Sequence, residues 1–545
     1  MLFILFTSII IIPTLSGWGK FLEIIFNKQL FEGISGKLMF GIFGISMIWT
    51  VLSFFIPLNL FVEIPTIVIG LFYFFKEKLF LKFYKFSKKD NILFALSTFI
   101  ILFCSSFYPY ILDHFGYYLP SIQWLREYGL VKGISNLDLV LGQMSIWHIF
   151  QSGFSNFTDP FLRINGVLLI IYLIYMIEKK SWIQLCFVPI LLLFSQSPSP
   201  DLPVIVFSLI LLNEILLNNK NTSLIFAFSI FVFAIKPTMI WLPILTFLYS
   251  IFILKSYFKI VLPGILILIL FCFKNIWTFG YPVFPVSMID FGFSWKPSAE
   301  LLNSSSQYAI QKTFDNQYSY EEIQKFSTLD YIKNWLFLDG IKSVINILFV
   351  FGLIVFTIFT FIKKNKIITF ICISLIIKSI LVLLFSAQYR FFIDVFFAII
   401  FVMLLDFFTQ RKSMIAYSFL SLAFISFVTF PSIVVRSIPS FRMSSFMGTF
   451  EWKQLSKPST YENKKYHSFE AGNLKFNVSE KYPFNFDTPI PAISESYVFD
   501  YQKAGVFPQL IDKNDIRKGF ISKKMNPEEQ KQVKNITEKI KNSYK

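Results

Sequence analysis

Apolar runs long enough to cross a membrane recur along most of this chain, and they restrict its fold more than any other feature. A helix that crosses the bilayer hydrocarbon needs about 20 residues, or somewhat fewer when flanking side chains reach the interface. The runs predict about fourteen spans. They lie near residues 2–17, 38–56, 59–75, 91–107, 162–177, 182–196, 203–217, 222–239, 240–254, 259–275, 342–362, 367–385, 391–409 and 413–430. The pair around Lys236-Pro237 also fits one broken helix plus a re-entrant piece.

The composition favours the same class. Of the 545 residues 55% are hydrophobic and only 15% are charged, whereas roughly a quarter are charged in a soluble domain. The net charge of +17 does not indicate a nucleic acid partner, because lysine marks the cytoplasmic loops of membrane proteins. The four cysteines show no metal-ligand spacing, and the first apolar run lacks a cleavage site, which favours a retained span. The predicted fold class is all-α, a polytopic membrane protein with long extracytoplasmic loops.

Basic residues predict which loops face the cytoplasm. They cluster at residues 76–89, 179–180, 220, 255–259, 363–366 and 411–412, which are alternate connections between the predicted spans. Because Lys and Arg are retained on the cytoplasmic side, these loops are predicted to lie inside. The complementary loops are then extracytoplasmic, namely 108–160, 197–203, the corner at 236–243, 276–341, 386–390 and the tail from about 432.

A carboxylate opens the first long extracytoplasmic loop. Asp113 follows the fourth predicted span within a run of tyrosines and prolines. A carboxylate there is a candidate general base if desolvation raises its pKa, and the alternative is an Asp that caps the next helix or is solvated. For its neighbour His114, a structural hydrogen bond at the boundary is the favoured interpretation.

A second carboxylate, Asp201, stands between prolines in the short extracytoplasmic turn 196–203. The prolines restrict the backbone, so the turn holds Asp201 at the top of the next span, where the alternative role is again helix capping. Two fixed carboxylates would let one accept a proton while the other orients an acceptor or binds a metal ion.

Cations are predicted on the same side as these acids. Lys236 lies near the outer end of a span, Lys274-Asn275 closes another, and Arg390 lies in a short turn with Asp394 one helical turn further on. Ionisable groups at membrane depth indicate function, and a guanidinium at the surface suits a bidentate grip on phosphate. The alternative for each cation is snorkelling to lipid headgroups.

Several signatures are absent from the sequence. It contains no Walker loop, dinucleotide fingerprint, H-E-x-x-H motif or C-x-x-C pair, so nucleotide-driven transport and zinc peptidase chemistry have no support. The tail beyond about residue 450 is predicted to be a small irregular appendage, and its last stretch from Asn526 a solvated helix or a disordered end.

The order of these motifs resembles the GT-C superfamily of membrane glycosyltransferases, and within it bacterial relatives of the protein-mannosyltransferase and aminoarabinose-transferase families. The motifs are Asp113-His-Phe-Gly-Tyr-Tyr-Leu-Pro, Glu127-Tyr-Gly-Leu-Val-Lys-Gly, Ser197-Pro-Ser-Pro-Asp, Lys236-Pro-Thr, Lys274-Asn with Gly280-Tyr-Pro-Val-Phe-Pro, and Gln388-Tyr-Arg-Phe. The resemblance covers residues 91–410. It divides the chain into accessory spans (1–90), a catalytic membrane module (91–410), a last span (411–431) and a small extracytoplasmic region (432–545).

The resemblance implies an inverting transfer of a sugar from a polyprenyl-phosphate donor to a glycan, lipid or protein acceptor, outside a bacterial cytoplasmic membrane. Asp113 would deprotonate the acceptor, and Asp201 would orient the acceptor or support Asp113. Lys236 and Arg390 would stabilise the leaving phosphate. His114, Tyr117 and Asn275 are further predicted substrate-binding residues. The superfamily often carries two adjacent acids in the first loop, but here Asp113 precedes a histidine. This departure puts a bound divalent metal in doubt and favours a metal-independent site, and no other cofactor is predicted.

Two other classes stay open. An O-antigen-type polymerase or ligase would rely on arginines and a histidine in a large outer loop, for which His148 is a weak substitute. A polysaccharide or lipid transporter would need charged residues midway through spans, and Lys378 and Glu214 are the obvious ones.

Overall fold

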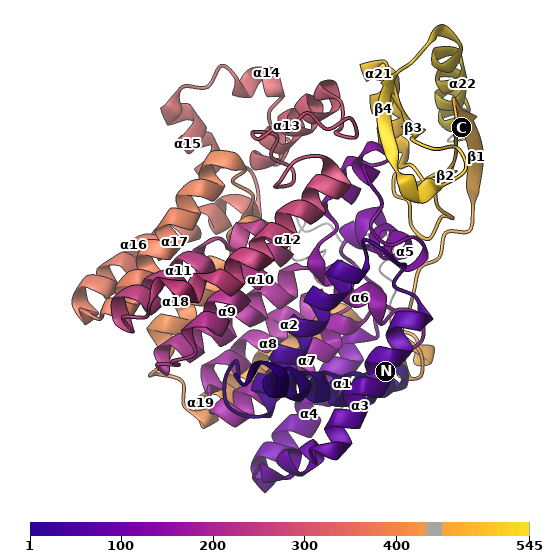
Figure 1. Cartoon of the computed structure of the whole chain (residues 1–545). Helices are drawn as coiled ribbons and strands as arrows, with labels where there is room; N and C mark the ends of the chain where they lie inside the picture. Colours follow the sequence, from indigo (N-terminus) through magenta and orange to yellow (C-terminus); the bar gives the residue numbers. More distant parts are fainter. Residues whose placement is uncertain (431, 433–435, 437–449, 544–545) are drawn as a thin grey trace.

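Helices make up most of the computed structural model, which describes residues 1–430, 432, 436 and 450–543 (Figure 1). The predicted boundary at residues 431 and 432 therefore falls at the edge of the described chain. Up to residue 280 the α-helices are α1 (Leu2–Phe26), α2 (Ile34–Leu52), α3 (Leu60–Lys76), α4 (Lys88–Ser105), α5 (Leu119–Glu127), α6 (Ile146–Gly153), α7 (Ile164–Lys179), α8 (Val188–Leu191), α9 (Asp201–Leu216), α10 (Thr222–Ile235), α11 (Trp241–Leu248) and α12 (Leu262–Phe279).

Later helices belong to the second long loop and the last apolar segments. They are α13 (Ala299–Thr313), α14 (Tyr320–Ile323), α15 (Thr328–Leu336), α16 (Ile341–Lys363), α17 (Lys366–Phe385), α18 (Ile393–Leu404) and α19 (Gln410–Thr429). Short helical turns join several of these. Those are η1 (Leu79–Lys85), η2 (His114–Tyr118), η3 (Ile134–Asn136), η4 (Leu139–Gln143), η5 (Trp182–Phe187), η6 (Leu192–Phe194), η7 (Pro237–Met239), η8 (Tyr249–Ile253), η9 (Phe258–Val261) and η10 (Tyr389–Phe391).

Six helices of the described chain are long and apolar enough to cross a membrane, which is the pattern of a multi-pass membrane protein. They are Leu2–Phe26, Ile34–Leu52, Phe258–Phe279, Ile341–Lys363, Lys366–Phe385 and Gln410–Thr429. Four shorter apolar helices cover Trp182–Phe194, Thr222–Ile235, Pro237–Ile253 and Ile393–Leu404. The larger predicted number of spans is not reached for two reasons: α3, α7 and α9 are undivided helices of only 16 or 17 residues, and prolines and short turns divide other runs. The run at 182–196, for example, is divided into η5, α8 and η6.

Close backbone packing holds the first helices together. A Cβ on Gly17 of α1 would lie 1.8 Å from the carbonyl oxygen of Gly70 of α3, so no larger residue fits this crossing. Glu178 at the end of α7 accepts hydrogen bonds from the backbone amides of Ile34 (2.7 Å) and Ser35 (3.0 Å). A carboxylate at this position satisfies amides that α2 leaves unpaired and complements its dipole.

The C-terminal unit, residues 450–543, corrects the all-α prediction because it contains two antiparallel hairpins. Strand β1 (Tyr466–Ala471) pairs with β2 (Leu474–Ser479), and β3 (Val506–Leu510) pairs with β4 (Phe520–Lys524). Around them lie η11 (Trp452–Leu455), α21 (Glu495–Ala504), η12 (Ile516–Lys518) and α22 (Pro527–Ser543). The final stretch is thus an amphipathic helix rather than a disordered end, since Val533, Ile536 and Ile540 are buried.

This unit lies beside α5, at the same end of the helical body as α13–α15 (Figure 1). Asp138, a fully buried residue of the first long loop, attaches this unit to the helical body. The carboxylate accepts bonds from the Ser494 amide (3.0 Å), the Ser494 hydroxyl (2.6 Å) and the Asn485 carboxamide (2.6 Å). Tyr501 of α21 adds a bond from its hydroxyl to the Leu137 carbonyl (2.7 Å).

We predict that Asp138→Ala loosens this attachment by about 3 kcal/mol, because the buried donors of Ser494 and Asn485 lose their hydrogen-bond acceptor. Hydrogen exchange of the α21 amides in the full chain measures the effect. Glu470→Ala, at an exposed position of the same unit, is the control and should leave the exchange unchanged. Equal protection in Asp138→Ala and the wild type would contradict the role of Asp138.

The same contact predicts a pH dependence. Burial raises the pKa of Asp138 from 3.8 to about 7, against the opposing effect of bonds from Ser494 and Asn485. Between pH 3.8 and about 7 the folded state binds a proton that the unfolded chain has released. The attachment therefore weakens as the pH rises through this window, and its stability changes no further above it. Protection of α21, corrected for intrinsic exchange, should fall across this window in the wild type and not in Asp138→Ala.

Candidate functional site

Four of the predicted site residues meet at the end of the helical body where the predicted extracytoplasmic loops lie. They come from different segments, and a local backbone feature holds each one. Asp113 precedes η2, Asp201 is the first residue of α9, Lys236 ends α10 in an extended conformation before Pro237, and Arg390 lies in η10. We call these residues the ionic cluster.

Arg390 bridges the two carboxylates of the ionic cluster. Its Nη1 lies 2.8 Å from Asp113 Oδ2, and its Nη2 lies 3.6 Å from Asp201 Oδ2. Lys236 Nζ pairs with Asp201 Oδ1 and also donates to the carbonyl oxygen of Arg390 at 3.1 Å. The cluster is therefore one connected network that ties three connections between helices to the first long loop.

The two acids differ in exposure. The Asp113 side chain is 30% exposed, whereas that of Asp201 is 9% exposed. Ser199 donates to Asp201 Oδ2 at 3.1 Å, and the Tyr118 hydroxyl lies 3.4 Å from the Ser199 hydroxyl. Asp201 is thus fixed on every side, and Asp113 is the acid that another molecule can reach.

The electrostatics of Arg390 follow from these contacts. Burial disfavours the charged guanidinium, but Asp113 and Asp201 together hold the pKa of Arg390 well above its ordinary value. Lys312 of α13 interacts electrostatically with both Asp113 and Arg390, and burial lowers its pKa. It has no carboxylate within salt-bridge distance among the described residues. Lys312 could not be identified from the sequence, because it lies in a polar helix whose position near the cluster is a tertiary feature.

Aromatic and imidazole groups lie beneath the network. The Tyr118 ring is 4.6 Å from that of Tyr117 and 4.9 Å from that of His148. Burial, together with a smaller contribution from Arg163, lowers the pKa of His114 to about 3, and burial with Lys274 does the same for His148. Both imidazoles are therefore neutral near pH 7, and Nδ1 of His114 has no hydrogen-bond partner in the described part of the chain.

Lys274 and Asn275 make structural contacts. Lys274 Nζ donates to the carbonyl oxygens of Gln143 (2.7 Å) and Met144 (3.0 Å), and the Asn275 carboxamide donates to that of Pro282 (2.8 Å). Each side chain thus fixes a loop, which gives Asn275 a role apart from the predicted substrate contact.

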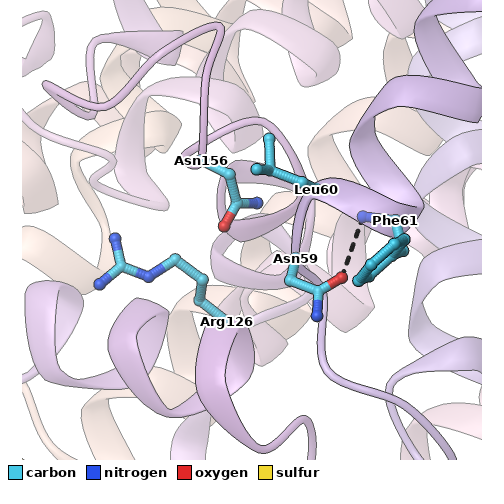
Figure 2. A pocket seen from close by; sticks show the side chains of 5 residues that line it. All are labelled: Asn59, Leu60, Phe61, Arg126 and Asn156. Carbon is cyan, nitrogen blue, oxygen red and sulfur yellow. Dashed lines mark hydrogen bonds between the residues drawn. The ribbon is translucent and has the colours of Figure 1, made fainter.

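A separate hollow of about 300 Å³ lies at the N-terminus of α3. Figure 2 shows its lining, which is Asn59, Leu60, Phe61, Arg126 and Asn156. In this view the guanidinium of Arg126 points away from the two carboxamides, and Asn59 accepts a bond from the Phe61 amide at 3.0 Å. Because these polar groups do not converge, the hollow is a weaker candidate than the ionic cluster.

For a metal ion, the residues described from 1 to 543 contain no group of three or more His, Cys, Asp or Glu side chains that could bind one. The two acids of the ionic cluster are instead bonded to cations. This arrangement suits the binding of an anion that displaces the carboxylates from those cations or shares the cations with them.

The fold and the site define a helical membrane protein whose connecting loops build a charged cluster. Residues 1–397 match the family DUF8201, described as a domain of unknown function, and the chain belongs to this family. The match includes all four cluster residues and runs through the predicted boundary at residue 90. Comparisons with curated proteins and with solved structures give no match.

We predict strong coupling within the buried pair of Asp201 and Lys236. Asp201→Asn alone leaves the buried Lys236 without its carboxylate and should cost about 3–5 kcal/mol of stability. Lys236→Met alone should cost less, because Arg390 still lies 3.6 Å from Asp201. The double variant should recover much of this loss. Thermal unfolding of the full chain in detergent measures both. Glu462→Gln, which breaks an exposed pair with Lys464, is the control and should change little. Additive losses in the double variant would contradict the coupling.

Proposed function

We propose that this protein is a membrane glycosyltransferase that moves a sugar from a polyprenyl-phosphate donor to an acceptor on the extracytoplasmic face. The single observation that supports it best is the ionic cluster, in which the accessible acid Asp113 pairs with Arg390 and Lys236 joins the same network through Asp201. The proposal includes a GT-C-like fold in a bacterial cytoplasmic membrane, with the shorter apolar helices as further crossings.

In this mechanism Asp113 is the base. It takes the proton of an acceptor hydroxyl, whose oxygen then attacks the anomeric carbon as the bond from that carbon to the phosphate oxygen breaks. The bonding electrons leave with the phosphate, and the transfer inverts the anomeric centre. Because a single displacement needs aligned reactants, holding donor and acceptor in place supplies much of the catalysis.

Arg390 and Lys236 stabilise the departing phosphate. Both cations contact carboxylates in the structure, so a bound phosphate competes with Asp113 for Arg390. This competition is useful, because a carboxylate released from a guanidinium is a stronger base. Asp201 keeps Lys236 and Arg390 in place, and Lys312 adds positive charge above them.

A transporter is the second candidate, because one observation favours it. Lys378 of α17 and Asp394 of α18 form a fully enclosed ion pair between apolar helices, and Trp241 also donates to Asp394 at 2.8 Å. Charges at such depth often mark a pathway through a membrane. An assay of the purified protein in vesicles that contain donor and acceptor distinguishes a transferase from a transporter. Only a transferase releases free polyprenyl phosphate.

We predict that Asp113→Asn abolishes sugar transfer while the amount of protein in the membrane stays unchanged, because the amide cannot accept the proton. Surface glycans and lipid-linked sugar pools, compared with and without each variant, measure the transfer. Asp406→Asn is the matched control, since the Asp406 side chain is 93% exposed in another part of the chain. It should retain activity. Full transfer by Asp113→Asn would exclude Asp113 as the base.

A further inference from the structure

An apolar groove of about 410 Å³ lies between α2 and α12. Its lining is entirely aliphatic: Met47, Ile48, Val51, Leu52, Leu266, Ile267 and Leu270. Both walls belong to helices long and apolar enough to cross a membrane. A groove of this composition in a membrane span fits a hydrocarbon chain, because it offers a chain contacts and no polar group.

Aromatic rings close one end of this groove. Phe54, two residues after the last α2 lining residue, packs against Phe273 at 5.1 Å and Trp277 at 5.8 Å between ring centroids. Trp277 follows Leu270 by seven residues on α12, which corresponds to about 10 Å along the helix. That distance is enough to lead from the hydrocarbon into the headgroup layer, where indole rings are favoured.

Directly beyond these rings lies Lys132, a half-buried cation held between two indoles. Its Nζ is 4.7 Å from the Trp277 ring centroid and 5.0 Å from that of Trp295. Hydrogen bonds fix both indoles, since Trp277 Nε1 donates to the Leu130 carbonyl (3.1 Å) and Trp295 Nε1 to the Ile276 carbonyl (2.8 Å). No described carboxylate lies within salt-bridge distance of Lys132. The lysine therefore has a rigid setting and no internal counter-ion.

We propose that this groove and Lys132 together form a binding site for an anionic bilayer phospholipid. One acyl chain fills the groove between α2 and α12, and the headgroup phosphate binds Lys132. The aromatic rings lie between the groove and Lys132. The order of the three features therefore matches that of a lipid, whose acyl chain is followed by its phosphate. The site shares no residue with the ionic cluster, so it is independent of the proposed transferase activity.

Titration of the delipidated full chain with palmitoyl-oleoyl-phosphatidylglycerol, followed by native mass spectrometry, tests this proposal. Lys132→Gln should weaken binding of this lipid about fivefold, as expected for one cation at a membrane surface. Val51→Phe, which places a ring in the groove, should weaken binding several-fold without changing any charge. The matched control is Arg126→Gln, which removes another cation of the same loop and should leave the affinity unchanged.

Three outcomes would overturn the proposal. Equal affinity of Lys132→Gln and the wild type would exclude the phosphate contact. A loss in Lys132→Gln with none in Val51→Phe would mean that the lysine attracts headgroups in general and that the groove is not part of a site. Binding of inorganic phosphate alone with the same affinity as the lipid, and with the same loss in Lys132→Gln, would exclude a lipid as the ligand.

Discussion

A buried charge needs a partner, and this requirement organises the region where the loops of this protein meet. Asp201 and Lys236 are both largely withdrawn from solvent, and each would be strongly unfavourable alone. Their pairing fixes the start of α9 to the end of α10, and the carbonyl of Arg390, which accepts from Lys236, adds the turn after α17. Arg390 then extends the network to Asp113 in the first long loop. A single chain of charges thus positions four segments.

The backbone makes this network possible at the ends of the helices. Asp201 follows a proline-rich turn, and Lys236 adopts an extended conformation because Pro237 prevents α10 from continuing. Side chains at helix ends project into the loop layer, where charge costs less than in the hydrocarbon. The exposed acid, Asp113, lies at the edge of the network, and the buried members keep its guanidinium partner in place. This division between a reachable group and its support is what an anion-binding site requires.

The sequence was sufficient to predict that the residues of the ionic cluster lie near one another, because the charge pattern of the loops predicted one side of a membrane for Asp113, Asp201, Lys236 and Arg390. It was not sufficient for Lys312, whose position depends on how α13 folds over the cluster. The sequence was also not sufficient to predict the helix lengths, because hydropathy alone does not show where turns such as η5 and η6 divide an apolar run. The first hairpin of the C-terminal unit had a usable signal. Gly472-Asn473, with Gly472 at φ 61°, precedes the alternating buried residues Leu474, Phe476 and Val478, a pattern typical of a two-residue turn.

The most direct test of the central claim is an experimental structure of the full chain in a lipid nanodisc with a polyprenyl monophosphate bound. We predict that the phosphate contacts Arg390 and Lys236 and that Asp113 moves out of its contact with the guanidinium. A phosphate bound elsewhere, with the pairs among Asp113, Asp201, Lys236 and Arg390 unchanged, would contradict it.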